Sequence, residues 1–305
     1  MSTTAPPRQD AAAGAKLLVV MMGFAWGLNW IAARIILEAL PPWTMRTAGM
    51  GLGALTLFAA AALRGVPLRI AREDRIKVLI AGFFNVALFG ACSAYAQVYG
   101  TTSRAVVIAY SMPIWASLLA WGLLGERFNT VRVAALALCA TGLTVLIWPL
   151  ARDGLPLGAL FALGCAWSWA AGTIYLKRVT IAAPTLAVAA WEVLLGTLML
   201  AAGMLVFEGL PHLPSLPTHV LLWLGYNGFI GMGLAYFLWF VVVDRLPAMT
   251  ASLGSLLVPV VGVIGSALVV GERPNVTDAL GFALIFAAAA CVLLQPGAKR
   301  TEMPE

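Results

Sequence analysis

Long apolar runs divide this chain, and they limit its possible folds more than any other feature. A helix needs about 20 mostly apolar residues to cross the hydrocarbon core of a bilayer, which is about 30 Å thick. Ten such runs, separated by Pro, Gly and charged residues, cover residues 16–37, 43–63, 76–99, 102–124, 130–149, 156–177, 184–207, 218–242, 248–270 and 275–295. They lack the two-residue alternation of barrel strands. The sequence therefore predicts an all-α membrane protein with ten transmembrane helices.

The composition supports a chain that is solvated by lipid. Hydrophobic residues make up 62% of the sequence and charged residues 10%, whereas a soluble domain carries about 25% charged residues. The net charge is +6, but the Lys and Arg residues sit between apolar runs rather than on one basic face with interleaved aromatic residues. We therefore expect a lipid bilayer around the protein and no nucleic-acid partner.

The positions of the positive charges predict the orientation in the membrane. If the N-terminus faces the cytoplasm, ten spans leave only Arg34, Arg46, Arg104, Arg152 and Arg273 on the opposite side. The cytoplasmic segments then hold the rest of the 19 Lys and Arg residues, as the positive-inside rule requires. We therefore expect both termini in the cytoplasm.

No pattern in the sequence points to a cofactor, a metal or an enzymatic reaction. His212 and His219 share one short polar loop without a zinc-binding pattern. The cysteines have no CxxC spacing, and each lies in an apolar run: Cys92, Cys139, Cys165 and Cys291. The sequence has no Ser/His/Asp set, no paired intramembrane carboxylates and no phosphate-binding loop. We expect no cofactor, no metal and no enzyme activity.

Two parts of the chain repeat one another. Residues 113–127 and 259–273 share a proline inside an apolar run and a Gly-Glu-Arg ending, and Ala-Trp-Gly at 25–27 is similar to Ala-Trp-Ser at 166–168. Each part holds five spans, and because five is odd the second part must enter the membrane upside down. The predicted units are a disordered tail at 1–15, a first repeat at 16–150, a second, inverted repeat at 151–296 and a short tail at 297–305.

Together these motifs resemble the drug/metabolite transporter superfamily, in particular its EamA-type members with ten helices. The resemblance rests on Ala-Trp-Gly at 25–27 with Asn29 and Trp30 behind it, on Arg46, and on the proline and Gly-Glu-Arg of both repeats. Within the family the chain looks most like the YddG-like exporters of aromatic amino acids. The resemblance implies a basket of ten helices with a central cavity. Because Ser168 replaces the expected Gly and Asn29 has no counterpart in the second repeat, the two halves are expected to contribute unequally to the site.

Polar and aromatic side chains inside the spans are the candidates for substrate binding. An Asn that faces lipid is costly, so such residues should point inward, and aromatic rings attract aromatic or cationic solutes. The candidates are Trp26, Asn29, Asn85, Tyr95, Tyr99, Tyr110, Ser111, Trp167, Trp169 and Asn227. Tyr95 and Tyr99 lie near the end of a span, so an interfacial aromatic belt is the alternative for them.

Glu192 is the one acid that the sequence places deep in a span. It could bind a substrate ammonium or exchange a proton for coupling; alternatively it pairs with an Arg on a neighbouring helix or is protonated and hydrogen-bonded. Arg34 and Arg46 lie near the opposite face and are expected to snorkel, although either could attract an anionic group. Glu126 and Glu272 end spans, so structural pairing with an Arg or with backbone amides is expected.

Pro113 and Pro259 occupy matched places in two spans. Proline lacks an N–H, so the carbonyl four residues earlier, of Ala109 or Ser255, loses its donor. In hydrocarbon such a carbonyl needs another partner, for example cavity water, a substrate amine or a hydroxyl. A structural kink and a helix break with a role in gating are both compatible with this pattern.

The sequence and the resemblance together predict a secondary transporter of the bacterial inner membrane. It would export small solutes, with amino acids (aromatic ones favoured) or related metabolites as substrates, by alternating access. Alternatives on the same fold are a multidrug or a nucleotide-sugar transporter. An intramembrane enzyme would need a converging reactive pair that the sequence does not offer. The expected partners are a small-molecule substrate and the bilayer; the oligomeric state stays open, and a monomer is compatible.

Overall fold

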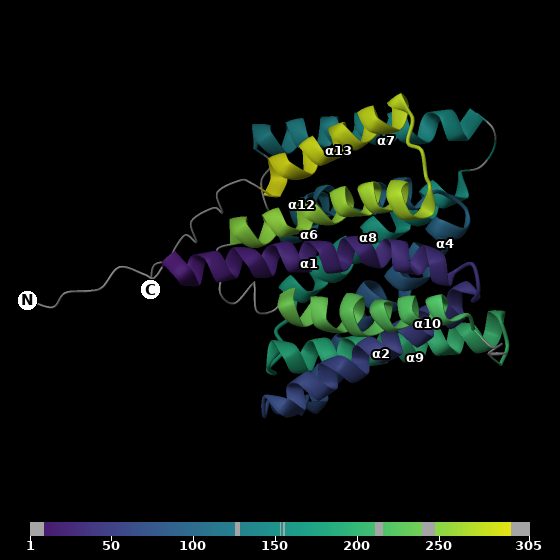
Figure 1. Ribbon diagram of the computed structural model, residues 1–305. Coiled ribbons are helices and arrows are strands. Elements are labelled where there is room, and N and C mark those ends of the chain that lie inside the picture. The colour runs from purple at the N-terminus through teal and green to yellow at the C-terminus, as the bar shows by residue number, and fades with distance from the viewer. Residues whose placement is uncertain are drawn as a thin grey trace, which may run out of the picture.

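The protein is a bundle of long helices (Figure 1). The computed structural model describes residues 9–125, 129–152, 154, 156–210, 216–239 and 248–293, and every regular element within them is a helix. Eight helices are long and apolar enough to cross a membrane: Leu17–Ile36, Pro42–Leu63, Arg72–Val98, Thr102–Leu124, Thr130–Arg152, Leu157–Arg178, Thr185–Phe207 and Thr218–Trp239. Two shorter apolar helices are Leu257–Val270 and Val276–Cys291. The prediction of an all-α, multi-pass membrane protein is confirmed over the described residues; the count of ten and the inverted arrangement stay predictions.

The helices follow the predicted runs, and several runs are built from more than one helical element. The first part of the chain contains α1 (Gln9–Ile36), α2 (Pro42–Leu63), η1 (Arg72–Asp74), α3 (Arg75–Gly82), η2 (Phe83–Leu88), α4 (Phe89–Val98), α5 (Thr102–Ala109), α6 (Met112–Leu124) and α7 (Thr130–Arg152). The second part contains α8 (Leu157–Arg178), α9 (Thr185–Phe207), α10 (Thr218–Gly225), η3 (Tyr226–Leu234), α12 (Ala248–Gly265), η4 (Ser266–Val270) and α13 (Val276–Leu293).

Helices from the first part of the chain pack on helices from the second part. The main pairs are α1 with α12, α2 with α9, α4 with α8 and α7 with α13. In the last pair, a Cβ atom on Gly142 would lie 3.1 Å from the carbonyl oxygen of Gly281, and one on Gly281 would lie 3.3 Å from that of Gly142. Glycine at both positions lets the two backbones approach closely. The two parts of the chain therefore interlock as one bundle.

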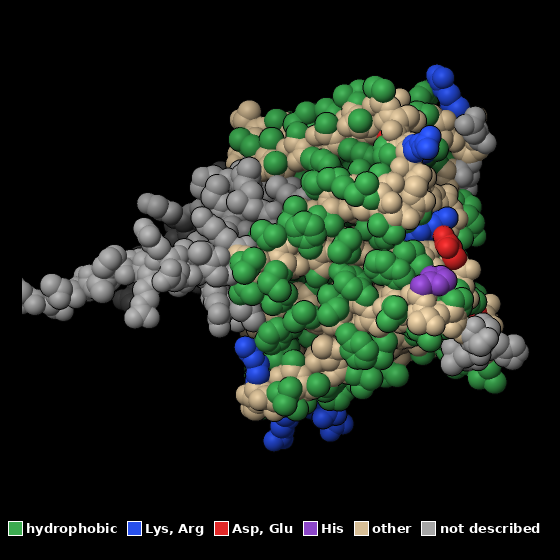
Figure 2. Space-filling view, in the orientation of Figure 1, with side chains coloured by type: hydrophobic (Ala, Val, Ile, Leu, Met, Phe, Trp, Pro, Cys, Tyr) green, Lys and Arg blue, Asp and Glu red, His purple; other side chains and the backbone are tan. Residues whose placement is uncertain are grey.

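The outer surface is the kind that faces lipid. Large apolar side chains such as Val206, Leu222 and Leu268 are largely exposed. Figure 2 shows hydrophobic side chains over most of the visible face, with Lys and Arg side chains towards its two ends. Because exposed apolar patches of this extent are not stable in water, the middle of the bundle is expected to sit in the hydrocarbon core.

The two prolines at matched places in the sequence act differently. A break at Tyr110 and Ser111 separates α5 from α6, which has Pro113 in its first turn. The Ser111 hydroxyl and backbone N–H both donate to the carbonyl of Ile108, at 2.7 and 3.1 Å. By contrast, α12 continues through Pro259. The proline therefore marks a helix break in the first span and an uninterrupted helix in the second.

Carboxylates hold the starts of two helices. Glu208 accepts the backbone N–H groups of Trp43 and Thr44 at the start of α2, at 2.8 and 2.7 Å. Glu272 accepts those of Thr102 and Ser103 at the start of α5. Such bonds satisfy N–H groups that have no partner inside the helix. The structural role expected for Glu272 is therefore confirmed, whereas Glu126 lies outside the described residues.

Candidate functional site

A cavity of about 390 Å³ lies inside the bundle. Its walls come from α1, α2, α4, α6, α7, α8, η3, α12 and α13, and from the residues that follow α5 and η3. Both parts of the chain therefore contribute to it. The volume falls within the range of about 300–1,000 Å³ that small-molecule sites usually have.

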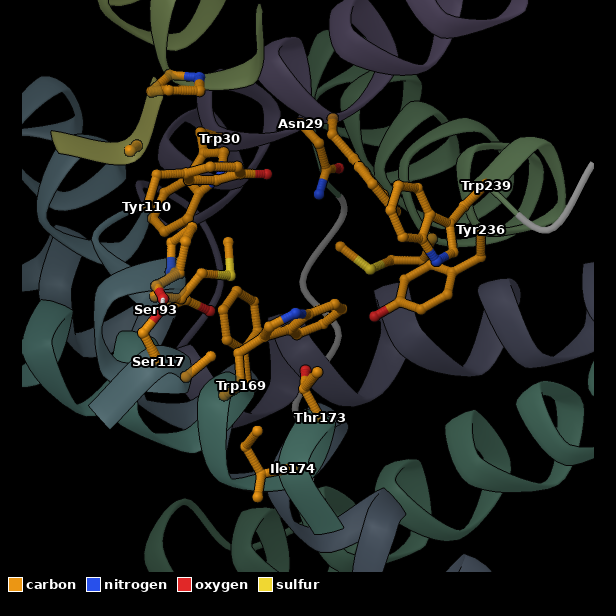
Figure 3. Close-up of a pocket in the computed structure, with 18 of the residues that line it drawn as sticks. Asn29, Trp30, Ser93, Tyr110, Ser117, Trp169, Thr173, Ile174, Tyr236 and Trp239 are labelled. Atoms are coloured by element: carbon orange, nitrogen blue, oxygen red, sulfur yellow. Dashed lines mark hydrogen bonds between the residues drawn. The ribbon is translucent and has the colours of Figure 1, made fainter. Parts of the chain in front are cut away.

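Eight aromatic rings line the cavity. The rings belong to Trp26, Trp30, Phe89, Tyr110, Trp169, Tyr236, Trp239 and Phe286. Figure 3 shows Trp30 and Tyr110 on one side of an open centre, Tyr236 and Trp239 on the other, and Trp169 between them. Trp169 contacts both Phe89 and Tyr236, with ring centroids 5.3 and 6.4 Å apart. A flat aromatic or aliphatic group entering the cavity would therefore meet ring faces and edges on several sides.

Hydroxyl groups add polar points to this apolar wall. Ser93 and Ser117 line the cavity, and each donates its proton to a carbonyl of its own helix, Gly90 at 2.9 Å and Pro113 at 2.8 Å. Because the protons are already used, these oxygens offer lone pairs to a bound solute. Asn29 also lines the cavity, and its Oδ1 accepts a hydrogen bond from Asn227 at 2.8 Å. Its amide nitrogen keeps its donor capacity.

The charged residues on the wall are all cations. Arg46, Arg132 and Lys177 line the cavity, and its described lining includes no Asp or Glu. The Arg46 side chain is only 4% exposed, and its Nε is buried without a hydrogen-bond acceptor among the described residues. This corrects the expectation that Arg46 snorkels to the membrane surface, because its side chain points into the protein. Arg34 donates to the backbone oxygen of Gln97 at 2.7 Å instead of reaching for solvent.

Several predicted site residues line the cavity and two others adjoin it. Among the predicted residues, the lining includes Trp26, Asn29, Tyr110, Pro113, Trp169 and Pro259. Asn227 lies directly behind Asn29, through the hydrogen bond above, and is 1% exposed. Ser111 is buried in the break between α5 and α6, where its hydroxyl also accepts a hydrogen bond from Trp115 at 3.0 Å.

Three predicted aromatic residues lie away from the cavity. Tyr95 accepts a hydrogen bond from Trp43 at 3.0 Å and stacks on Tyr99, with ring centroids 6.1 Å apart. Tyr99 is 53% exposed, which agrees with the aromatic-belt alternative. Trp167 is also largely exposed and packs on Trp115. None of these three is part of the lining.

The buried Asn85 and the half-buried Glu192 form a separate pair. The Asn85 amide nitrogen donates to Glu192 Oε1 at 2.6 Å, and neither residue is part of the cavity lining. The Asn85 carbonyl oxygen is buried and has no partner among the described residues. Asn85 lies in η2 and Asn227 in η3, and both segments are π-helical. Such segments recur at functional sites, and no sequence signal marked them here.

Sequence reasoning missed several residues of the wall. The missed residues include Ser93, Tyr236 and Trp239, although other residues of the same spans are predicted to bind substrate. Whether their side chains point inward depends on the backbone of α4 and η3. The sequence predicts that Arg46 lies at the membrane surface. In the structure its stem lies beside Gly90 of α4, where a Cβ would be 3.8 Å from Arg46 Cδ. This placement depends on the packing of α2 on α4, which the sequence of a single span does not show.

Apolar spans around a cavity lined by aromatic rings are typical of polytopic membrane proteins that hold small solutes. The chain belongs to the EamA-like transporter family, because the family's model matches residues 14–148 and again residues 156–294. The broad part of the family resemblance is therefore confirmed. The narrower likeness to exporters of aromatic amino acids is not tested by this match.

Relatives match over nearly the whole chain. The chain is 26% identical to the probable amino-acid metabolite efflux pump of Escherichia coli (strain K12), over 88% of this chain and 91% of that one. It is 24% identical to the uncharacterized transporter YoaV of Bacillus subtilis (strain 168), over 88% and 92% of the two chains. A crystal structure of a protein matches with a TM-score of 0.65 at 24% identity, over 92% of this chain and 96% of that one. At this identity the structural match shows the fold alone.

Proposed function

We propose that this protein is a secondary transporter that exports small solutes, aromatic amino acids or related metabolites, across the bacterial inner membrane. The observation that carries the proposal is the aromatic cavity between the two parts of a chain from a transporter family. One relative is named a probable amino-acid metabolite efflux pump, and another, YedA of Escherichia coli (strain K12), an uncharacterized inner membrane transporter. The YddG-like subtype is the narrower form of this proposal.

The proposed topology has ten spans in two inverted repeats, at 16–150 and 151–296, with both termini in the cytoplasm. The twofold match of the family model supports a duplication. Two shorter apolar helices beside the eight long ones bring the possible spans to the expected number. The bias of Lys and Arg supports the orientation. Reporter tags at the two termini test it, since tags on opposite faces of the membrane would overturn the arrangement.

Alternating access would come from movement of one repeat against the other around the cavity. The helix break before Pro113 supports this, because Tyr110 in the break and Pro113 after it both line the cavity. A break of this kind lets α6 tilt without moving α5. Pro259 lines the cavity from an unbroken helix, so we assign the gating movement to the first proline and a fixed wall to the second.

Substrate selection would come from the rings. Purified protein in proteoliposomes should exchange labelled phenylalanine or tryptophan with an internal pool, and protein-free liposomes should not. Trp169→Ala should lower the affinity roughly 10-fold, because it removes one wall of the cavity. Tyr99→Ala is the matched control outside the cavity and should leave affinity unchanged. Exchange that is absent for every aromatic amino acid would overturn the proposed substrate.

Glu192 is the candidate for proton coupling. It is an acid within a span, and its hydrogen bond to Asn85 holds it beside a π-helical segment. A carboxyl in such a place can take up and release a proton as its surroundings change. Uptake with and without a pH gradient tests this role. A uniport mechanism is the alternative, and it predicts no effect of the gradient and none of Glu192→Gln.

A nucleotide-sugar transporter is the second candidate, because three cations line the cavity and phosphate groups bind cations. A competition experiment decides between the two candidate functions: labelled phenylalanine is bound, and unlabelled solutes are tested for displacing it. Displacement by a nucleotide sugar but not by unlabelled phenylalanine would favour the second candidate.

A further inference from the structure

The fixed charge of the cavity is of one sign. Arg46, Arg132 and Lys177 line it, and no carboxylate occurs in the part of its lining that the structure describes. Glu192, an acid of the neighbouring helix α9, hydrogen-bonds Asn85 outside the lining, although its charge acts on Tyr236, which does line the cavity. Apolar walls concentrate the field of such charges on the enclosed space. The cavity is therefore arranged for an anionic group rather than for a cation.

Arg46 is the cation that the structure leaves most in need of a partner. Its side chain is 4% exposed, yet no ion pair or hydrogen bond to its guanidinium occurs among the described residues. A guanidinium carries five N–H donors and no acceptor. Removing such a group from water without an acceptor is strongly unfavourable. An acceptor that arrives with the solute would satisfy it.

The surroundings of Arg46 direct it to the cavity. It lies in the second turn of α2, and Met50, one turn later, also lines the cavity. Both side chains lie beside Gly90 of α4, where a Cβ would be 3.7 Å from Met50 Cε and 3.8 Å from Arg46 Cδ. Ser93, the next lining residue of α4, offers an oxygen nearby but no negative charge.

We propose that Arg46 binds the carboxylate of the solute, and that the solutes are aromatic carboxylates whose amino group is dispensable for binding. This rests on the proposed transport of aromatic solutes. The planar guanidinium matches a carboxylate with two parallel hydrogen bonds. The rings of Trp26, Trp169 and Tyr236 then enclose the aromatic body.

The described lining of the cavity offers the amino group no carboxylate as a counter-ion. An α-ammonium would meet ring faces and the oxygens of Ser93 and Ser117, which are weak partners compared with a carboxylate. An amine that lacks a carboxylate would also be repelled by Arg46. The cavity therefore selects aromatic acids, includes aromatic amino acids among them, and excludes arylalkyl amines and cationic drugs.

Four solutes that share a phenyl ring separate these contributions. They are 3-phenylpropionate, phenylalanine, phenylalaninamide and phenethylamine, measured by titration calorimetry on the purified full-length protein. We expect 3-phenylpropionate and phenylalanine to bind with affinities within a few-fold of each other. We expect the amide and the amine to bind roughly 10- to 100-fold more weakly, the range for a hydrogen-bonded charge. An amide or amine that binds as tightly as the acids overturns the proposal, as does a lack of binding by both acids.

Variants test the assigned residue. Arg46→Gln should lower the affinity for both acids roughly 10- to 100-fold, and Arg46→Lys should restore part of it. Arg69→Gln removes an exposed arginine that is outside the cavity lining and should bind both acids as the unaltered protein does. Without solute, Arg46→Gln should melt at or above the temperature of the unaltered protein, because the lost charge had no partner. Unchanged affinity in Arg46→Gln overturns the assignment; if that variant does not fold, the four-solute series decides.

Exchange in proteoliposomes separates this inference from the transport proposal. Acids that bind through Arg46 but do not exchange across the membrane would overturn transport and leave the binding site standing. Exchange of phenethylamine or phenylalaninamide at rates equal to those of the acids would support transport and overturn the carboxylate site.

Discussion

Two buried asparagines invite comparison, because their backbones are alike and their partners are not. Asn85 lies in the π-helical segment η2, and Asn227 lies in the π-helical segment η3. Each faces a glycine of a neighbouring helix: a Cβ on Gly172 would overlap Asn85, and one on Gly49 would overlap Asn227. Both parts of the chain therefore use the same combination of an irregular helix, a buried amide and a glycine across from it.

The partners differ in charge and in place. Asn227 donates to Asn29, a neutral side chain that lines the cavity. Asn85 donates to Glu192, and neither of these residues lines the cavity. The same local structure, a buried Asn in a π-helical segment, therefore binds a neutral side chain at the cavity in one case and an acidic side chain away from it in the other. The bond to Asn85 thus holds the acid outside the described lining, whose charged residues are cations, while its charge still acts on Tyr236 of that lining.

The largest effect is expected from adding a methyl group opposite either asparagine. Gly49→Ala and Gly172→Ala each place a Cβ on a buried, hydrogen-bonded Asn side chain, and overpacking of this kind costs about 1–3 kcal/mol. Thermal melting in one detergent measures it. Gly122→Ala in α6 is the control, because its Cβ would meet no atom within 4 Å. Equal melting temperatures for all three variants would show that the two sites are loosely packed.

An effect of similar size is expected from removing either asparagine, and it depends on which partner is left without its hydrogen bond. Asn85→Leu removes the amide that donates to the Glu192 carboxyl. Asn227→Leu removes the amide that donates to the neutral side chain of Asn29. A lost hydrogen bond costs about 1–3 kcal/mol when a buried polar group stays unpaired, and more for a charged one. Asn85→Leu should therefore lower the melting temperature more. The reverse order would indicate that Glu192 does not depend on Asn85.

Replacing the acid of the Asn85–Glu192 pair by an amide tests whether the two pairs differ in their role in transport. Glu192→Gln can keep a hydrogen bond to Asn85 and makes the pair resemble Asn29 with Asn227. If Glu192 exchanges a proton, the stimulation of uptake by a pH gradient should be lost while exchange without a gradient continues. Melting should change little, because the hydrogen bond is retained. Gradient-driven uptake equal to that of the unaltered protein would end the coupling role.

The smallest effect concerns affinity. Asn29→Ala removes an amide from the cavity wall, so aromatic acids should bind about 2- to 10-fold more weakly, as expected for one neutral hydrogen bond. Asn85→Ala changes the pair that is not part of the wall and should leave affinity unaltered. Calorimetric titration measures both. A larger loss in Asn85→Ala would place that pair in contact with the solute after all.

The spans could be predicted because hydropathy depends on each run alone. Over the residues that the structure describes, the helices follow the predicted runs. Cavity residues such as Trp26 and Trp169 could be predicted, because a large polar or aromatic side chain deep in a span has few other places to lie than the interior of the bundle. Tyr95 and Tyr99 show the limit of that reasoning, since a ring near a span end serves a membrane interface equally well.

The rest depends on contacts between spans. The different behaviour of Pro113 and Pro259 does not follow from proline chemistry, because both lack the same N–H. The burial of Arg46 depends on the packing of α2 against α4. The segments η2 and η3 are π-helical, and the amino-acid composition of these segments does not predict this. In each case a neighbour distant in sequence decides the outcome.

The carboxylates of Glu208 and Glu272 have a consequence for how fast such a protein can work. Both tie helix starts of the first part to the second part, across 165 and 170 residues for the Trp43 and Thr102 bonds. They lie towards one end, since Trp43 contacts Tyr95, which stacks on Tyr99 just before Thr102. If the two parts separate there, both carboxylates must exchange backbone donors for water in every cycle. The turnover rate would then depend on Glu208 and Glu272, which lie outside the cavity lining. Substitutions there could change the rate of transport without changing which solutes bind.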